Sequence, residues 1–573
     1  MSTDISIKIA GAAGQGMQTI GFILGKVLTR SGLHVFAVQD NESRIRGGHN
    51  FFQLRVSENP VISMTERVDV LVALNQNSVD LHQDELSGKG TVVFDSEQIQ
   101  AKKKTANLCG IPLENLALEH AGNKRYFNTV ALGAVIGILK SDFHRLDDFL
   151  KTFFSSKSEV ADANSRAAKA GFDYISKNYA DFSLPLPICQ QPTKKMFING
   201  NEAIALGALA AGCQFFAAYP MSPATTILTY LAGKADECKM IVEQAEDEIA
   251  AITMAISASF TGVRSMTATS GGGFSLMVES LGFAGVSETP LVIVNAQRPG
   301  PATGLPTRTE QSDLRFVLHA SQGEFPRVIL APGTAREAFY LTIKAFHLAY
   351  KYQVPVLLLT DQYLADSFFT EEKFDNFPQD IDTFFPTGKE LSKDKIYLRY
   401  RFTETGVSPR IPPSWQGYES ICDSHEHTED GHITEDPLIR TKMVEKRFKK
   451  LESIAQELDH PLMIGPDTAD MLFIGWGSTY GVLKEVTELL LNEGVSISLM
   501  HLQSIWPFPD TRFGQKLEQS KRCIVVENNA TSQLSSIIQE MIGHKPDGHI
   551  LKYDGRPFSF EELLNAVRKE INL

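Results

Sequence analysis

The chain has few cysteines and no pattern among them, which narrows its class. No two of the six form a CxxC pair, and they are spread along the 573 residues at Cys109, Cys189, Cys213, Cys238, Cys422 and Cys523. Scattered cysteines argue against a disulfide framework and favour a cytoplasmic protein. The same spacing argues against an iron–sulfur site of the usual motif type within this chain.

The chain also lacks an excess of basic residues. It contains 55 Lys and Arg against 68 Asp and Glu, with a formal net charge of −13. Binding to nucleic-acid phosphates needs a basic face, so no nucleic-acid partner is expected. No segment approaches the roughly 20 consecutive apolar residues of a membrane span. The first eight residues show no basic segment followed by an apolar one, so no signal peptide is predicted.

Length and composition indicate a globular protein of several domains. The hydrophobic content is 43% and the charged content 21%, which is ordinary for soluble domains. At roughly 150 residues per domain the chain is long enough for three or four. A proline-rich connector at 183–192 marks a boundary, and a long irregular stretch at about 376–437 is typical of a loop that wraps a partner or covers a site.

Strands and helices alternate along the chain and predict layered α/β domains. We predict three domains: residues 1–190, residues 195–437 including the irregular extension, and residues 460–573. Helices are expected at about 17–31 and 480–492. The principal strands are expected at 5–10, 34–38, 51–56, 68–74, 90–94, 213–218, 265–269, 290–295, 327–330, 354–359, 495–500 and 523–526.

Two motifs in the second domain point to chemistry. Tyr219-Pro-Met-Ser222-Pro follows a strand and presents a hydroxyl group on a proline-stiffened turn. Glu246-Asp-Glu248 opens a helix of small residues, where a half-buried carboxylate would suit the activation of a nitrogen heterocycle. Each motif also has a purely structural explanation, because acidic residues stabilise helix starts and prolines end strands.

A third motif is the run 295–311, which contains two arginines. The preceding strand delivers Arg298 to the carboxyl end of a sheet, where open α/β folds bind ligands. A guanidinium group there can bind a carboxylate through two parallel hydrogen bonds. Arg308 is a second candidate, and two arginines would suit a substrate with two carboxylates. The alternative is that both form structural ion pairs with Glu310 or Asp313.

Two further patterns are weaker. Gly11-x-x-Gly14-Gln15-Gly16 lacks the G-x-G-x-x-G spacing of a dinucleotide site, although Asp40 lies near the position of the usual acidic residue. Because the N-terminal glycines partly fit such a site, a dinucleotide-binding oxidoreductase subunit remains an alternative. The histidines at 425, 427 and 432 complete no tetrahedral ligand set, and we assign no metal to them.

Taken together, the motifs resemble the thiamine-diphosphate-dependent 2-oxoacid:ferredoxin oxidoreductases over essentially the whole chain. The order of the motifs resembles that of an alpha subunit in which a gamma-type domain, a pyrimidine-binding domain and a transketolase C-terminal-like domain are fused. In the family the turn reads Tyr-Pro-Ile-Thr-Pro, whereas here Met221 and Ser222 replace the isoleucine and the threonine. Ser222 keeps the hydroxyl group, and the loss of the threonine methyl group would slightly enlarge the pocket, so the size of the substrate does not carry over from the family. The run 295–311 most resembles the 2-oxoglutarate-type members.

The resemblance implies roles for individual residues. Glu248, which directly precedes Ile-Ala-Ala and so fits better than Glu246, would contact the aminopyrimidine of thiamine diphosphate as the catalytic acid. The implied substrate-binding residues are Ser222, Arg298, Tyr219, Thr307 and Arg308. The implied residues for coenzyme A, which the gamma domain is expected to handle, are Gly14, Gln15, Gly16 and Arg46.

The chain has no Gly-Asp-Gly segment followed by the asparagine with which thiamine enzymes hold Mg²⁺ and the diphosphate. The resemblance therefore implies a beta subunit that carries the diphosphate, the Mg²⁺ and a [4Fe–4S] cluster, in an (αβ)₂ assembly. The expected activity is the reversible oxidative decarboxylation of 2-oxoglutarate with coenzyme A to succinyl-CoA and CO₂, with electrons passed to ferredoxin. A relative that acts on pyruvate or another 2-oxoacid is the main alternative.

Overall fold

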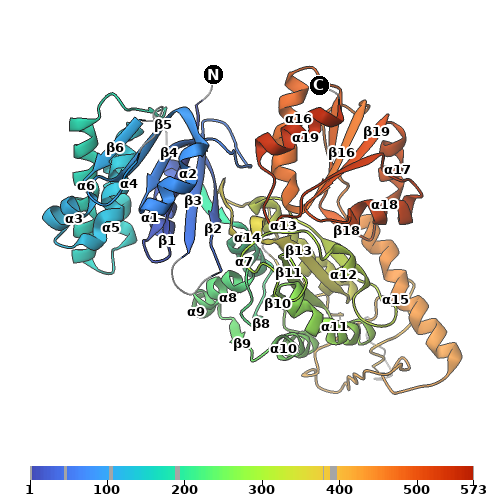
Figure 1. Ribbon diagram of the computed structural model, residues 1–573. Helices are drawn as coiled ribbons and strands as arrows, with labels where there is room; N and C mark the ends of the chain where they lie inside the picture. The colour runs from blue at the N-terminus through green and yellow to red at the C-terminus, as the bar shows by residue number, and fades with distance from the viewer. Residues whose placement is uncertain are drawn as a thin grey trace. The chain divides into compact units, whose positions relative to one another are not determined.

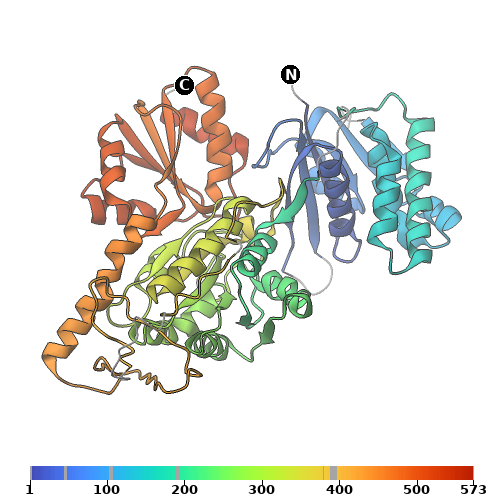
Figure 2. The ribbon, with the colours of Figure 1, turned by 180° about the vertical axis from the view of Figure 1, so that it is seen from behind.

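The computed structural model describes residues 3–43, 48–101, 107–187, 194–378, 380–386 and 397–571. The chain divides into two compact units (Figures 1 and 2). The first comprises Met1–Ile198, Ser367–Lys373 and Ser559–Leu564, and the second comprises the rest. Together they hold three sheets flanked by helices, so the α/β class is confirmed. Among the described residues, every helix is too short or too polar to cross a lipid bilayer.

The first unit is built on an eight-stranded mixed sheet with the order β6-β5-β4-β1-β3-β2-β14-β7. The strands are β1 (Asp4–Ala12), β2 (His34–Asp40), β3 (His49–Ser57), β4 (Val68–Ala73), β5 (Leu86–Asp95), β6 (Asn107–Ile111), β7 (Met196–Asn199) and β14 (Phe368–Glu371). The helices are α1 (Met17–Arg30), α2 (Gln76–His82), α3 (Leu113–Ala121), α4 (Phe127–Ile138), α5 (Phe143–Phe153) and α6 (Ser158–Asn178). Strand β14 comes from a distant part of the chain and pairs with β2.

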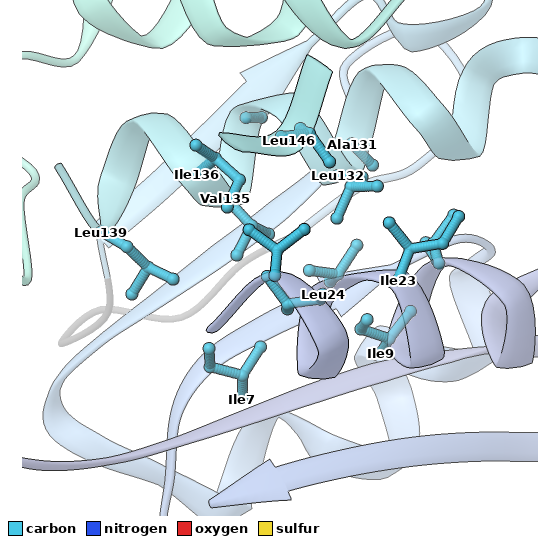
Figure 3. Close-up of a cluster of buried hydrophobic side chains, with 14 of the residues drawn as sticks. Ile7, Ile9, Ile23, Leu24, Ala131, Leu132, Val135, Ile136, Leu139 and Leu146 are labelled. Atoms are coloured by element: carbon cyan, nitrogen blue, oxygen red, sulfur yellow. The ribbon is translucent and has the colours of Figure 1, made fainter. Parts of the chain in front are cut away.

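Helix α1 is buried on two sides because its apolar residues follow the helical period. Buried positions recur every three or four residues at Ile20, Ile23, Leu24, Val27 and Leu28. Figure 3 shows α1, with Ile23 and Leu24, between strand β1, which carries Ile7 and Ile9, and helix α4. This packing forms the main core of the first unit.

The second unit contains a seven-stranded sheet with the order β18-β12-β13-β11-β10-β8-β9. The strands are β8 (Phe215–Ala218), β9 (Ile241–Gln244), β10 (Ser265–Thr269), β11 (Leu291–Gln297), β12 (Val328–Leu330), β13 (Pro355–Asp361) and β18 (Ser504–Trp506). The helices are α7 (Gly200–Ala210), α8 (Thr225–Ala232), α9 (Ala235–Cys238), α10 (Glu248–Phe260), α11 (Gly271–Val286), α12 (Leu314–His319), α13 (Ala335–Tyr352) and α14 (Gln362–Asp366). All pairings except that of β18 are parallel, so the carboxyl ends of six strands share one edge.

A smaller sheet completes the second unit with the order β15-β17-β16-β19-β20. The strands are β15 (Leu462–Ile464), β16 (Met471–Trp476), β17 (Ile497–Leu502), β19 (Arg522–Glu527) and β20 (Gly548–Leu551). The helices are α15 (Pro437–Glu457), α16 (Tyr480–Asn492), α17 (Asp510–Glu518) and α18 (Gln533–Ile542). Helix α19 (Phe560–Glu570) follows, and its residues up to Leu564 belong to the first unit. Helix α15 leads from the irregular segment to this sheet (Figure 1).

The irregular segment packs on the amino edge of the seven-stranded sheet. The Arg410 guanidinium donates to the Ser259 carbonyl oxygen at 2.9 Å, and Arg399 donates to the Glu288 carbonyl oxygen at 2.7 Å. Ser259 and Glu288 lie in the chain just before β10 and β11. Described residues of the segment therefore contact the edge opposite to the carboxyl ends of the strands.

Glu288 anchors helix α15 to this edge through buried charges. Its carboxylate forms ion pairs with Lys446 and Lys450, and all three side chains are at least 98% buried. Burial alone would raise the pKa of Glu288, but Lys446, Lys450 and Arg399 lower it below its ordinary value. Burial lowers the pKa of Lys450 to about 7 despite the nearby carboxylate.

Replacing Glu288 with Gln should lower the free energy of unfolding by about 3–5 kcal/mol, because two buried lysines lose their counter-charge. Urea unfolding followed by tryptophan fluorescence measures the change. Glu237→Gln is the matched control, since its ion pair with Lys234 is exposed and should contribute little. Equal midpoints for the two variants would show that the buried cluster does not anchor α15.

Candidate functional site

Four loops leave the carboxyl edge of the seven-stranded sheet side by side. They follow the parallel strands β9, β8, β10 and β11, which are neighbours in that order. In open α/β sheets ligands bind at this edge. The fold thus brings three predicted motifs together: the turn at 219–223, the helix start at 246–251 and the run at 295–311.

Glu248 is a buried carboxylate at the first residue of α10. Its neighbour Asp247 caps the helix by accepting a hydrogen bond from the Ala250 N–H at 2.7 Å, so Glu248 is not needed as the cap. Glu248 is only 3% exposed, and its Oε1 has no hydrogen-bond partner among the described residues. Glu246, in contrast, is exposed. Because an unpaired buried polar atom is costly, Glu248 Oε1 suits a hydrogen-bond donor from outside the chain.

Gly273 makes room for this carboxylate. A Cβ atom at Gly273 would lie 2.5 Å from Glu248 Oε1 and 2.1 Å from Thr269 Oγ1, closer than side-chain atoms can approach. Thr269 ends β10, and its hydroxyl lies 3.9 Å from the sulfur of Met221. The Glu248 carboxylate therefore lies against the first turn of α11, close to the turn that contains Met221.

Arg298 connects the third motif to the first. Its Nη1 donates a hydrogen bond to the carbonyl oxygen of Ser222 at 2.9 Å. Burial lowers the pKa of the Arg298 guanidinium, but an arginine remains cationic at neutral pH. Among the described residues no carboxylate forms an ion pair with Arg298, so its charge is not neutralised locally. Ser222 and Tyr219 are both exposed at the same turn.

A pocket of about 450 Å³ opens beside Arg298. Loops after β8 and β11 and the start of α11 line it with Met221, Gly271, Gly272, Ser275, Arg298, Pro299, Gly300, Pro301, Ala302, Thr303 and Asp313. Its walls carry a guanidinium group. The first backbone N–H groups of an α-helix such as α11 have no partner within the helix. These donors suit a small carboxylate ligand.

Asp313 also lines this pocket, and the sequence did not predict which groups contact its side chain. Its carboxylate accepts a hydrogen bond from Asn295 Nδ2 at 3.2 Å, and its backbone N–H donates to Gln297 Oε1 at 2.9 Å. Burial raises the pKa of Asp313 to about 6, against the lowering effect of the bond from Asn295. The sequence offered Asp313 only as an ion-pair partner for an arginine, because nothing local indicates that the loop returns to the end of β11.

The small sheet holds the segment that carries Asp313. Gln311 is fully buried; its Nε2 donates to the Trp476 carbonyl oxygen at 2.8 Å and its Oε1 accepts from the Asn528 N–H at 3.0 Å. The Asn529 amide donates to the Gln311 carbonyl oxygen at 3.1 Å. The small sheet therefore positions one wall of the pocket without lining it.

Thr307 and Arg308 do not line the pocket with Arg298. The backbone of this segment lies beside Gly555, whose carbonyl oxygen accepts a hydrogen bond from the Thr309 N–H at 3.3 Å. A Cβ atom at Gly555 would lie 3.3 Å from the Cβ of Arg308. The two arginines of the motif thus have different surroundings.

Residues 14–16 form the turn between β1 and α1 in the first unit. The Gln15 side chain holds this turn, because its Oε1 accepts from Asn75 Nδ2 at 2.9 Å and its Nε2 donates to the Leu74 carbonyl oxygen at 3.0 Å. Gly14 is exposed. Arg46 lies outside the described residues.

The histidines of the irregular segment interact with protein groups. The His427 ring lies 3.9 Å from the Tyr400 ring, and His425 and His432 each lie beside an aspartate. No cluster of three or more His, Cys, Asp or Glu side chains suited to a metal ion occurs in the described part of the chain.

Three protein-family models match the chain. Residues 206–446 match "Pyruvate flavodoxin/ferredoxin oxidoreductase, thiamine diP-bdg". Residues 6–174 match "Pyruvate ferredoxin/flavodoxin oxidoreductase", and residues 469–563 match "Pyruvate:ferredoxin oxidoreductase core domain II". The models follow each other in the order that the motifs predicted.

Relatives match over nearly the whole length. The 2-oxoacid:ferredoxin oxidoreductase subunit alpha of a Sulfolobus species is 32% identical over 99% of this chain and 97% of its own. The 2-oxoglutarate oxidoreductase subunit KorA of Mycobacterium tuberculosis is 29% identical over 94% of this chain and 87% of its own. A solved 2-oxoglutarate:ferredoxin oxidoreductase from Magnetococcus marinus, with 2-oxoglutarate, coenzyme A and succinyl-CoA bound, covers 100% of both chains at 32% identity and a TM-score of 0.91.

Proposed function

This chain belongs to the alpha-subunit family of the 2-oxoacid:ferredoxin oxidoreductases, and from that premise we propose that its substrate is 2-oxoglutarate. The proposed reaction is reversible: 2-oxoglutarate and coenzyme A give succinyl-CoA and CO₂, and two electrons pass to ferredoxin. The observation that carries this proposal is the full-length likeness to the Magnetococcus marinus enzyme, which binds 2-oxoglutarate and succinyl-CoA. The Mycobacterium tuberculosis relative also supports it.

The site fits the aminopyrimidine of thiamine diphosphate, for which the chain has a binding domain. When bound, this cofactor supplies the carbon nucleophile and the electron sink for decarboxylation of a 2-oxoacid. Glu248 offers a buried oxygen without a partner among the described residues, beside a glycine that leaves space. We assign to Glu248 the role of holding a proton at the pyrimidine ring nitrogen. Glu246 does not fit this role because it is exposed.

We assign to Arg298 the binding of the substrate carboxylate. A guanidinium group has five N–H donors, and the bond to the Ser222 carbonyl uses one of them. The Ser222 hydroxyl and Tyr219 stand at the same turn and would orient the keto group. We also propose that Thr307 and Arg308 contact the second carboxylate of the substrate. Since neither residue lines the Arg298 pocket, this contact would lie outside that pocket.

The chain is the alpha subunit of a multi-subunit enzyme, and we propose an (αβ)₂ assembly with ferredoxin as the electron acceptor. The beta subunit would hold the diphosphate, the Mg²⁺ and the [4Fe–4S] cluster, because this chain has no CxxC pair and no Gly-Asp-Gly segment. For coenzyme A we propose the turn at Gly14–Gly16 together with Arg46. Since the Gln15 side chain holds the turn, the backbone of this turn is the part available to a phosphate.

The test is to express the chain with the beta subunit of its own host and to measure viologen reduction with a panel of 2-oxoacids. The proposal expects the highest kcat/KM with 2-oxoglutarate and a requirement for coenzyme A. A preference for pyruvate or a branched-chain 2-oxoacid would contradict the substrate assignment and leave the family intact.

Gly273→Ala should reduce turnover by about 10²-fold, because the added methyl group displaces the Glu248 carboxylate and misplaces it by a few tenths of an ångström or more. Steady-state viologen reduction measures the loss. Gly233→Ala is the matched control, since its Cβ would meet nothing closer than 3.5 Å. Equal turnover in the two variants would show that the position of this carboxylate is not critical.

A further inference from the structure

Among the described residues that line the Arg298 pocket, Asp313 is the acidic one. Three contacts hold it in place: the Asn295 amide donates to its carboxylate, Gln297 accepts from its backbone N–H, and Gly271 packs directly against it. A Cβ atom at Gly271 would lie 2.3 Å from Asp313 Oδ2. The carboxyl group is therefore fixed at the first turn of α11, on the same pocket as Arg298.

The charges around Asp313 leave it without a counter-ion. No cation forms an ion pair with it among the described residues. Three other ionisable groups lie near Asp313. Arg298 lines the same pocket from the loop after β11, and Glu310 lies on the same segment as Asp313. Glu248, at the start of α10, lies on the other side of Gly273. Burial raises the pKa of Asp313 to about 6. An ionised carboxylate there would repel an anionic ligand, whereas the protonated acid is a hydrogen-bond donor.

We propose that Asp313 is a substrate-binding residue whose protonated carboxyl group donates a hydrogen bond to the carboxylate that Arg298 binds. This rests on the proposed role of the pocket as the 2-oxoacid site. Arg298 supplies the charge, Asp313 supplies a neutral donor and Asn295 orients it. Binding therefore takes up one proton from solvent onto Asp313, and no other bond forms or breaks.

The first test is the pH dependence of KM for 2-oxoglutarate in the complex with the beta subunit. The wild-type KM should rise by about tenfold for each pH unit above 6, because only the protonated form binds, while kcat changes little. Asp313→Asn keeps a donor that does not titrate, so its KM should stay low across this range. Glu310→Gln, on the same segment but outside the pocket lining, should keep the wild-type rise. A wild-type rise in Asp313→Asn would overturn the proposal.

The second test needs no turnover. The complex is mixed with 2-hydroxyglutarate, which has the same carboxylates but no keto carbon, in weakly buffered solution with a pH indicator. At pH 7.5 the wild-type complex should take up about one proton per bound molecule, and Asp313→Asn should take up none. Saturable binding without proton uptake would overturn the role of Asp313. A wild-type complex inactive with every 2-oxoacid would instead overturn the proposed function, so the two failures are distinguishable.

Discussion

Replacement of Glu248 with Gln is expected to lower turnover by at least about 10³-fold, while the chain still folds and binds its beta subunit. The two side chains have nearly the same shape, so the packing against Gly273 is retained. What is lost is the acidic group that we propose shares a proton with the ring nitrogen of the cofactor. Viologen reduction measures turnover, while gel filtration and the thiamine diphosphate content of the purified complex report assembly and cofactor binding.

Glu246→Gln provides the matched control two residues away. Glu246 is exposed, so its replacement should leave turnover and cofactor content at the wild-type level. If Glu248→Gln kept more than about a tenth of wild-type turnover, the assignment of Glu248 as the activating acid would be wrong. If Glu246→Gln caused the large loss instead, the two acids would have to exchange roles.

Replacement of Arg298 with Ala is expected to raise KM for 2-oxoglutarate by about 10²-fold or more, because it removes the proposed charge-assisted pair of hydrogen bonds to the substrate carboxylate. Arg298→Lys should raise it by about tenfold, since an ammonium group cannot form the parallel pair. Initial rates over a range of substrate concentrations separate KM from kcat. An unchanged KM in both variants would show that another group binds the carboxylate.

Replacement of two other arginines, Arg315 and Arg308, extends this experiment. Arg315 is exposed on α12, and its replacement with Ala is the control for loss of positive charge in the region. Arg308→Ala tests the second carboxylate: the proposal expects KM to rise for 2-oxoglutarate but not for pyruvate, which has only one. A rise for both substrates would point to a general effect on the loop rather than to a specific contact.

Local patterns predicted most of the strands in the described residues and, with stated bounds, the two helices α1 and α16. Strand β10 and helix α16 have the predicted bounds, and α1 ends one residue earlier than expected. Helix α15 was missed, for a physical reason. Its buried face includes Lys446, Arg447 and Lys450, so it has little of the apolar stripe by which a helix is recognised in a sequence. Those charges become compatible with burial only because Glu288 and Glu426 meet them there.

The sequence indicated some residues of the candidate site but did not settle the choice between others. Motif resemblance pointed to Glu248, Ser222 and Arg298, and the fold places all three at one sheet edge. The local sequence could not choose between Glu246 and Glu248 on physical grounds, since both stand at the same helix start. Burial distinguishes them in the structure.

The sequence by itself determined the α/β class, the order of the family's domains and the motifs of the site, because hydrophobic period, turn residues and motif spacing are properties of neighbouring residues. Tertiary structure alone decided which groups lose water and which meet. Gly273 lies against Glu248, and Asp313 returns to the end of β11 to share a pocket with Arg298. The protonation of a carboxyl group depends on its desolvation and on the charges around it, and both are set by segments far away in the chain.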